Sequence, residues 1–327
     1  MQFNSLRRAL LTLALSPAYL LLVTPILNPG ALKAQTLTSG DIAGTIQDAS
    51  GALIPGADVK ALNTGTGAVK ETTAGSAGDY RISLLQPGSY TVTVTAKGFR
   101  TTQTSLTLSV GQIATQDFKL SLAQNAQTVE VLAQEVPLLQ KDTSEMSTTI
   151  NFEQVQNLPN PGGDITYPVN VTQGVVMNTQ GGYGNAEAFG LPATSNNFTI
   201  NGAEDNDPFL NLNNSGPSNL LLGANDVDEI NIVANAYGAQ YGSLGGVQEN
   251  ILTRSGTNGF HGNVVYYWTN SDMNANQWFN DNTGTPQAYS NANQGAAAIS
   301  GPIVKDKAFF FANYETLRFE KIGRAHV

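Results

Sequence analysis

The fold is decided by the segment from Ser255 to Arg318, which contains three stretches of similar character. They read Ser255-Gly256-Thr257-Asn258-Gly259-Phe260-His261-Gly262, then Asn263-Val264-Val265-Tyr266-Tyr267-Trp268, and later Gly301-Pro302-Ile303-Val304-Lys305-Asp306-Lys307-Ala308-Phe309-Phe310-Phe311. Long aromatic-rich strands joined by Gly and Asn turns are typical of a β-barrel that spans a membrane. The segment therefore predicts the first strands of such a barrel, about three of them.

A sheet in lipid is stable only when it closes, because an open edge leaves backbone N–H and C=O groups without partners. We therefore expect residues 255–321 to be the start of a truncated barrel, and the chain to be the front end of a larger protein. Residues 322–327 resemble the translation of a sequencing-library adapter, and we expect them to be a non-native tail.

The composition favours a mainly β protein. Of the 327 residues, 41% are hydrophobic and 13% are charged, with 33 Gly and no Cys. Low charge and abundant Gly fit an all-β chain of several domains. The lack of Cys excludes thiolate metal sites, a Cys nucleophile and disulfides. The net charge of −9 argues against nucleic acid as a partner, because phosphate contacts need clustered Lys and Arg.

Residues 1–34 have the three parts of a secretory signal. The pair Arg7-Arg8 is basic, the run Ala9–Val23 is apolar and rich in Leu, and a small residue precedes the expected cleavage point. An uncleaved membrane anchor is the alternative, but Pro17 and Pro25 shorten any continuous helix below the ~20 residues that a span needs. We expect a cleaved signal peptide that exports the chain.

Residues 35–122 show the alternation of a small β-sandwich. In the run from Tyr90 to Thr95, Tyr90, Val92 and Val94 fall on one side of the strand and the three Thr fall on the other. This gives one apolar face and one solvated face. Strands at this spacing, separated by Gly and Pro, predict two packed sheets.

Several motifs of this region resemble the carboxypeptidase regulatory-like domain: Gly44-Thr45-Ile46, Ile54-Pro55-Gly56-Ala57, Gly78-Asp79-Tyr80, Leu85-Gln86-Pro87-Gly88-Ser89-Tyr90 and Lys97-Gly98-Phe99. The resemblance implies a seven-stranded transthyretin- or Ig-like sandwich with an accessory role, and no peptidase. Starch-binding-like folds are grouped with it, so we considered sugar contacts. Phe99 follows Gly98 in a turn and is the expected exposed candidate for a carbohydrate contact, whereas Tyr90 is expected in the core.

Residues 123–135 are expected to form a linker. Within it, a short alternating segment resembles the energy-coupling box of TonB-dependent receptors, namely Thr128, Val129, Glu130, Val131, Leu132 and Ala133. The resemblance implies contact with the periplasmic TonB protein, and an exposed strand can be captured by pairing with the edge of a partner's sheet. So short an alternation is equally compatible with a last strand or a simple linker, and both interpretations stay open here.

Residues 136–254 predict a small mixed α/β domain. Asn151–Leu158 predicts a short helix ended by Pro159, Thr194–Ala203 predicts a strand with an Asn-Gly turn, and Val227–Val233 predicts another strand. This order is similar to the plug domain of TonB-dependent receptors, which fills the barrel.

The start of the barrel resembles the Oar-like branch of these receptors. The matching motifs are Arg254-Ser255-Gly256-Thr257-Asn258, Phe260-His261-Gly262, Gly301-Pro302-Ile303-Val304-Lys305-Asp306-Lys307, Phe309-Phe310-Phe311 and Asn313-Tyr314-Glu315. Two stretches depart from the family pattern. Gln248-Glu249-Asn250 replaces a more apolar strand, and Ala296-Ala297-Ala298 replaces a Gly-rich stretch, so the expected strand register is less secure than the resemblance.

The sequence offers little for enzyme chemistry. His261 and His326 are the two histidines, and no zinc-protease, G-x-S-x-G, P-loop or G-x-G-x-x-G motif occurs. We expect His261 in a turn or at a barrel rim, and the acidic run Glu204–Asp207 in a solvated loop, because it lacks the spacing of an EF-hand. The aromatic residues of the barrel strands predict an interfacial girdle. No catalytic residue, metal or cofactor is expected.

The resemblance implies an outer-membrane TonB-dependent receptor or transporter that takes up an unidentified substrate. Its expected partners are a TonB-type energy-coupling protein, outer-membrane lipid and an unknown extracellular ligand, for which a carbohydrate is one candidate. The expected location is the outer membrane of a Gram-negative-type bacterium. The alternative is a cell-surface carbohydrate-binding or adhesion protein that acts through the N-terminal sandwich.

Overall fold

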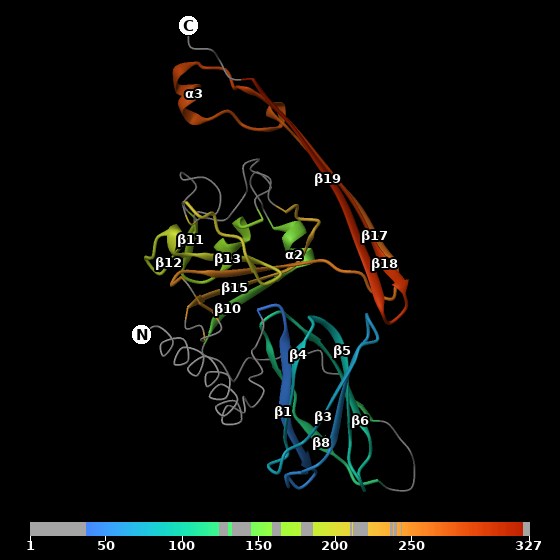
Figure 1. Cartoon of the computed structure of the whole chain (residues 1–327). Coiled ribbons are helices and arrows are strands. Elements are labelled where there is room, and N and C mark those ends of the chain that lie inside the picture. The colour runs from blue at the N-terminus through green and yellow to red at the C-terminus, as the bar shows by residue number, and fades with distance from the viewer. Residues whose placement is uncertain are drawn as a thin grey trace, which may run out of the picture. The chain divides into compact units, whose positions relative to one another are not determined.

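The structure is a computed structural model that describes residues 37–123, 130–132, 145–158, 165–177, 186–209, 211, 222–235, 238, 241–242 and 244–322 (Figure 1). Every described element belongs to the unit Gln35–Val327. The expected signal peptide at 1–34 and residues 323–327 of the expected tail lie outside the described residues. The described part is mainly β, as predicted.

The N-terminal domain is a sandwich of two sheets (Figure 1, blue to green). Its strands are β1 (Gly40–Asp48), β2 (Asp58–Asn63), β3 (Val69–Thr73), β4 (Asp79–Leu85), β5 (Gly88–Thr95), β6 (Thr102–Leu108), β7 (Ile113–Thr115) and β8 (Phe118–Leu120). One sheet has the order β4-β1-β7, with β8 also paired to β1. The other has the order β3-β2-β5-β6-β9, where β9 is Glu130–Leu132.

Strands β7 and β8 continue one another along β1. Both run parallel to β1 with the same offset, since Asp41 pairs with Ile113 and Ile46 pairs with Phe118. Between them, the Asp117 carboxylate accepts hydrogen bonds from the Thr45 backbone N–H at 2.8 Å and from its hydroxyl at 2.9 Å. A side chain therefore replaces the backbone acceptor at this point, which interrupts the strand without ending the ladder.

The sandwich core follows the predicted alternation. Tyr90, Val92 and Val94 of β5 are buried, and the intervening Thr91 and Thr93 are more exposed. They join the buried residues of the facing strands in one cluster that includes Ile42, Ile46, Val59, Tyr80 and Phe118. Each such side chain stabilises the fold by about 1.5–3 kcal/mol through burial of apolar surface.

The central domain is a mixed α/β unit, with β13 and β16 parallel and the other pairs antiparallel. Its sheet has the order β10-β15-β16-β13-β14, and β11 and β12 form a separate pair. The elements are β10 (Met146–Asn151), α2 (Phe152–Asn157), the 3₁₀ helix η2 (Tyr167–Val171), β11 (Val175–Met177), β12 (Ala186–Ala188), the 3₁₀ helix η3 (Ala193–Ser195), β13 (Asn197–Ile200), β14 (Ala203–Glu204), β15 (Val227–Asn235) and β16 (Gln248–Thr253).

The predicted short helix and the predicted Asn-Gly turn of this domain are both present. The helix α2 also has a capping box that was not predicted, because the Asn151 side chain accepts from the Gln154 N–H at 2.9 Å while Gln154 accepts from the Asn151 N–H at 3.0 Å. Asn201 and Gly202, with φ of 50° and 81°, form the two-residue turn between β13 and β14. Positive φ at both central residues is what a tight hairpin requires and what Asn-Gly readily adopts.

The central sheet carries an apolar row and a polar row of side chains on opposite faces. Four isoleucines lie in register across four strands, from Ile150 through Ile230 and Ile251 to Ile200. The next row along the strands is Thr149, Asn231, Asn250 and Thr199. Because it is offset by one residue in each strand, its side chains lie on the opposite face of the sheet. This polar row is hydrogen-bonded at both ends, from the Asn231 amide to the Thr149 hydroxyl at 3.2 Å and from the Thr199 hydroxyl to Asn250 at 2.7 Å. The departure Gln248-Glu249-Asn250 is therefore part of a paired, buried strand.

The last described region is an antiparallel sheet in the order β17-β18-β19 (Figure 1, orange to red). It consists of β17 (His261–Asn270), the 3₁₀ helix η4 (Ser271–Met273), α3 (Trp278–Thr283), β18 (Tyr289–Val304) and β19 (Ala308–Ile322). At about 3.4 Å per residue, strands of this length are ample for the ~25 Å apolar band of an outer-membrane barrel. Within the described residues, every helix falls short of the length and apolar character that a transmembrane helix needs.

Candidate functional site

One face of the β17–β19 sheet exposes apolar side chains around Val264 and Tyr314, and Arg318 and Glu320 lie on the same face towards the end of β19. Val264 pairs with Ala297, which pairs with Tyr314, and the side chains of Val264 and Tyr314 are 82% and 72% exposed. On this face the Tyr266 hydroxyl donates to Asn293 at 2.6 Å, and the Trp268 indole N–H donates to Asn291 at 2.9 Å. Exposed apolar surface whose polar atoms are bonded within the sheet is suited to lipid.

The opposite face of the same sheet contacts the central domain through polar side chains. Asn263 and Asn313 both pair with Ala298, so their side chains flank this small, buried residue on one face. Between them lies Asn225 of the central domain, which is 1% exposed. Its amide donates to Asn313 at 2.9 Å and it accepts from Asn263 at 2.5 Å. The Asn313 amide in turn donates to Asp226 at 2.8 Å.

Arg254, directly after β16, lies at the centre of the contact between the central domain and the β17–β19 sheet. Its guanidinium carbon lies 4.3 Å from the ring centroid of Phe152 and 5.3 Å from that of Phe311. Its Nη1 donates to the Asn225 carbonyl oxygen at 3.4 Å and to the Asn263 side chain at 3.2 Å. A planar cation suits both tasks, because it can stack on rings while its N–H groups bind oxygens in its plane. We call Phe152, Asn225, Arg254, Asn263, Phe311 and Asn313 the junction cluster.

Arg254 also acts on a neighbouring carboxyl group. Burial raises the pKa of Asp228 above its usual value, and the positive charge of Arg254 opposes this rise. The carboxylate of Asp228 and the guanidinium of Arg254 are thus coupled within the central domain. Loss of the guanidinium would leave a desolvated acid without its cation.

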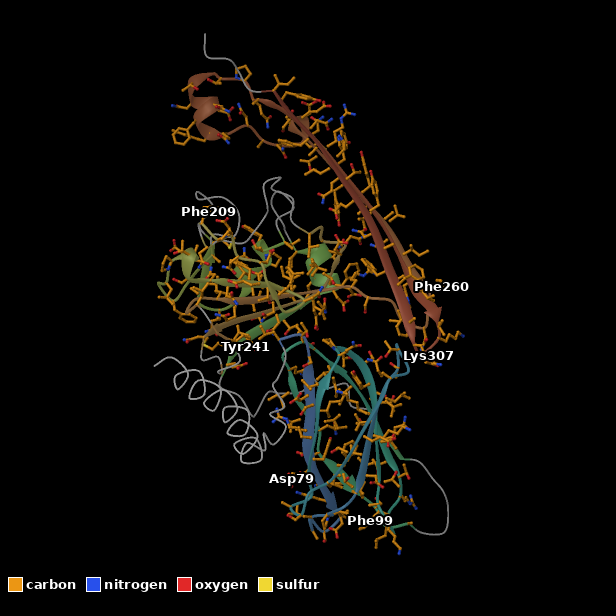
Figure 2. All side chains as sticks on the ribbon, in the orientation of Figure 1. Asp79, Phe99, Phe209, Tyr241, Phe260 and Lys307 are labelled. Carbon is orange, nitrogen blue, oxygen red and sulfur yellow. The ribbon has the colours of Figure 1, made fainter. Side chains whose placement is uncertain are left out.

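The backbone turns from the central domain into the barrel strands at Gly256, which only glycine fits. A Cβ at Gly256 would lie 2.7 Å from the carbonyl oxygen of Gly301 and closer still to that of Phe310. Beside this turn the rings of Phe260 and Phe310 lie 6.3 Å apart. Figure 2 shows Phe260 and Lys307 at the same end of the strands. A further link joins the two regions, since the Tyr267 hydroxyl donates to Gln156 at 3.1 Å.

The predicted TonB-contact residues are only partly described. Thr128, Val129 and Ala133 lie outside the described residues. Glu130, Val131 and Leu132 form β9, which runs parallel to β6 with Glu130 opposite Thr102 and Leu132 opposite Thr104. The segment is therefore seen as a paired strand at the edge of the sandwich.

Phe99 is not the exposed ring that the sequence led us to expect. It is half-buried and packs against the sandwich core. The reason is a backbone bridge between Phe99 and Leu122, supported by the Arg100 N–H bonding to the Ser121 carbonyl at 2.8 Å, which draws the turn onto the end of the sandwich (Figure 2). Its role as a carbohydrate contact stays a prediction. Tyr90 is buried, as expected.

The two other sites considered from sequence lie at strand ends, since His261 begins β17 and Glu204 of the acidic run ends β14. His261 is exposed at the start of β17, with its Nδ1 3.0 Å from the Gly259 carbonyl oxygen in the preceding turn. In the acidic run, Asn206 organises the loop, because it accepts from the Phe198 N–H at 2.8 Å and donates to the Asn196 carbonyl at 2.8 Å. Across the described ranges, no group of three or more His, Asp or Glu is placed to hold a metal ion.

Sequence reasoning missed the junction cluster. Arg254 and Asn313 stood within motifs that carried a resemblance, and Asn225 carried no signal. The available clue was Arg254 itself. It is a single cation directly after the strand Asn250-Ile251-Leu252-Thr253, and the sequence shows no obvious partner for its charge.

Comparison with known proteins agrees with this geometry. Residues 41–121 match the model of the carboxypeptidase regulatory-like domain, and residues 252–326 match that of an outer membrane beta barrel domain. The chain resembles the TonB-dependent transporter Oar. That protein, from Myxococcus xanthus, is 26% identical over 287 residues, which cover 84% of this chain and 26% of the relative. The chain thus spans about a quarter of the length of the curated relative it matches.

Among solved structures, similarity is weak. The Bacillus anthracis TIE protein matches with a TM-score of 0.24 and 16% identity, covering 26% of this chain and 17% of that chain. The Streptococcus agalactiae minor pilin GBS52 matches with a TM-score of 0.23 and 14% identity, covering 28% of this chain and 48% of that chain.

These matches confirm three expectations. They are the resemblance to Oar-like receptors, the regulatory-like domain and the outer-membrane barrel domain. The interpretation of the central domain as a plug, and the exact number of strands in each domain, stay predictions.

Proposed function

We propose that this chain forms the periplasmic and plug portion, with the first barrel strands, of an outer-membrane TonB-dependent transporter for an unidentified substrate. The observation that carries the proposal is the two-faced β17–β19 sheet. One face exposes apolar side chains around Val264 and Tyr314, and the other is joined to the central domain by Asn225 and Arg254. A barrel wall around an enclosed plug requires this division of lipid-facing and inward-facing residues.

In this proposal, residues 136–254 plug the barrel, and the junction cluster fixes the plug to the first and third described barrel strands. Transport requires the plug to move, so these contacts have to be exchanged during the cycle. Hydrogen bonds among amides suit that task, because each contributes only about 0.5–1.5 kcal/mol net when water can replace the lost partner.

The energy for this movement would come from a TonB-type protein that captures the segment at Thr128–Ala133 by strand pairing. The similarity to a TonB-dependent transporter supports such a partner in general terms. No covalent chemistry is involved, and the chain acts as a transporter and not as an enzyme. Export through the signal peptide would deliver it to the outer membrane.

The test uses the protein expressed from its complete gene. We expect it to sediment with outer membranes and to bind the purified periplasmic domain of a TonB-type protein. A variant lacking residues 127–134 should keep its location and lose this binding. Recovery of the protein in the soluble periplasm would overturn the transporter assignment, and unchanged binding by the deletion variant would overturn the coupling role of the segment.

A further inference from the structure

The edge of the sandwich at β6 is covered by a segment from outside the sandwich domain. β9 pairs with β6 through Thr102 opposite Glu130, Gln103 opposite Val131, and Thr104 opposite Leu132. The other edge of β6 is paired antiparallel with β5 along its whole length. Thus β6 would be the edge strand of its sheet were it not for these three residues of the segment proposed to bind TonB.

The β6 strand is anchored to the sandwich core. Thr102 and Thr104 are both 0% exposed, and they lie on the same side of β6 as Leu108 of the core. An uncovered β6 would present a row of free backbone N–H and C=O groups, the kind of edge that pairs with another strand. Gln103 and Ser105, on the other side of β6, are more exposed. The edge is therefore suited to accept a strand.

The pairing is short enough to be reversible. It spans the three residues of β9 and runs parallel, the orientation that is slightly less stable per residue. Exchange of these backbone hydrogen bonds for others of the same kind changes the free energy little, because each contributes only about 1 kcal/mol net. A second sheet edge could therefore compete for the same segment.

From these observations we propose that the β6 edge of the sandwich is the resting docking site of the chain's own coupling segment Glu130–Leu132, and that a TonB-type partner must displace it from this edge. The inference rests on the proposed coupling role of the segment. It gives the regulatory-like sandwich a function, which is to hold the segment paired until the partner's sheet competes for it. The occupant of the edge is this chain itself and no foreign strand.

A disulfide can lock the docked state, because residues 1–327 contain no Cys and any Cys encoded elsewhere in the complete gene is replaced by Ser. Gln103→Cys with Val131→Cys places the thiols at directly opposed positions of neighbouring parallel strands, where the Cα atoms are about 4.8 Å apart and within disulfide range. The protein is produced from its complete gene and solubilised from outer membranes. It is then oxidised or reduced, and its binding to the periplasmic domain of a TonB-type protein is measured.

The matched control is Ser105→Cys with Val131→Cys. Ser105 lies two residues further along the same face of β6, so its Cα would be about 8 Å from that of residue 131, beyond disulfide reach. We expect the Gln103/Val131 pair to cross-link and the control pair to remain as free thiols. The single variants report whether either substitution alone disturbs folding.

We expect the oxidised Gln103/Val131 variant to lose binding of the TonB-type domain and the reduced variant to regain it. Absence of the cross-link would overturn the docking, whatever the binding result. A cross-linked protein that still binds would overturn the displacement step. If the cross-link forms but neither the reduced variant nor the wild-type chain binds, the coupling role itself fails, and the displacement by TonB fails with it.

Discussion

Arg254 and Phe152 form a stacked pair, with the guanidinium carbon 4.3 Å from the ring centroid. Phe152 is the first residue of α2, and Arg254 follows the last residue of β16, so the pair closes the central domain on itself. The same guanidinium reaches Phe311 and Asn263 of the barrel strands. One side chain therefore links the internal packing of the central domain to its attachment to the sheet.

Replacing Arg254 with Lys tests whether its charge or its planar shape is responsible for this link. Arg254→Lys keeps the charge but loses the planar fork and the stacking surface, and we expect it to lower the free energy of unfolding by about 1–2 kcal/mol. Urea unfolding of the protein in detergent measures this change. Arg318→Ala, which removes an arginine that is 79% exposed, is the control and should change stability by less than about 0.5 kcal/mol. Equal effects of the two variants would contradict a special role for Arg254.

The hydrogen bonds of the buried Asn225 side chain lead to a second prediction. Asn225→Ala should cost about 1–3 kcal/mol, because Asn263 and Asn313 would then have polar groups facing an apolar methyl. Asn313→Ala removes one of the same hydrogen bonds, so the double variant should be less destabilised than the sum of the single ones. Additive losses in this double-mutant cycle would show that the two residues are not coupled.

The entry into the barrel strands depends on the absence of a side chain at one position. Gly256→Ala should destabilise the protein, because its Cβ would meet the backbone carbonyls of Phe310 and Gly301, which cannot rotate away as a side chain can. Gly242→Ala is the matched control, since a Cβ there meets nothing within 4 Å. Thermal unfolding of both variants tests the difference. A neutral Gly256→Ala would mean that the strands can separate at this turn.

The carboxyl group of Asp205 leads us to expect that the stability of the fold depends on pH. Burial raises the pKa of Asp205 from 3.8 to about 6. Between these values the folded protein retains a proton that the unfolded chain has released, so stability should fall as the pH rises from about 4 to about 6 and level off above. Asp205→Asn should flatten this decline and unfold at a higher temperature than the wild type at pH 7. Melting curves across this range measure it, and parallel profiles for the two proteins would contradict the prediction.

The exposed face of β17 tests the proposed contact with lipid. Val264→Arg places a charge on that face, and near the middle of a bilayer such a substitution costs about 2–4 kcal/mol. We expect less folded protein in outer membranes, measured by the heat-modifiable mobility typical of barrels. Val264→Thr keeps the side-chain shape without a charge and should have a much smaller effect. Normal assembly of the Arg variant would place this face in water.

Local features of the fold could be predicted from the sequence, because neighbouring residues fix them. Alternation over a few positions puts Tyr90, Val92 and Val94 on one side of a strand in any context. Asn201 and Gly202 readily adopt the positive φ that a tight turn needs. The helix at 152–157 was foreseen from its position before Pro159, although its capping box was not.

The partners of individual side chains could not be predicted in this way. Phe99 has the sequence setting of an exposed turn residue, and a backbone bridge to Leu122 nevertheless draws it against the core. Six alternating residues from Thr128 to Ala133 fit a free or a paired strand equally well, and only the presence of an open edge on β6 distinguishes the two for Glu130–Leu132. In each case the deciding atoms are remote in the chain.

The amino-acid sequence by itself thus determined local features: the alternation along β5, the Asn201-Gly202 turn, the short helix before Pro159 and the mainly β character of the chain. The tertiary structure alone decided that Arg254 lies between Phe152 and Phe311, residues about a hundred and about sixty positions away along the chain. The alternation of side chains along a strand and the preferred φ of a turn depend on neighbouring residues, so they can be read from the sequence. Stacking and hydrogen bonding act over a few ångströms in space, so they are settled only when distant segments have met.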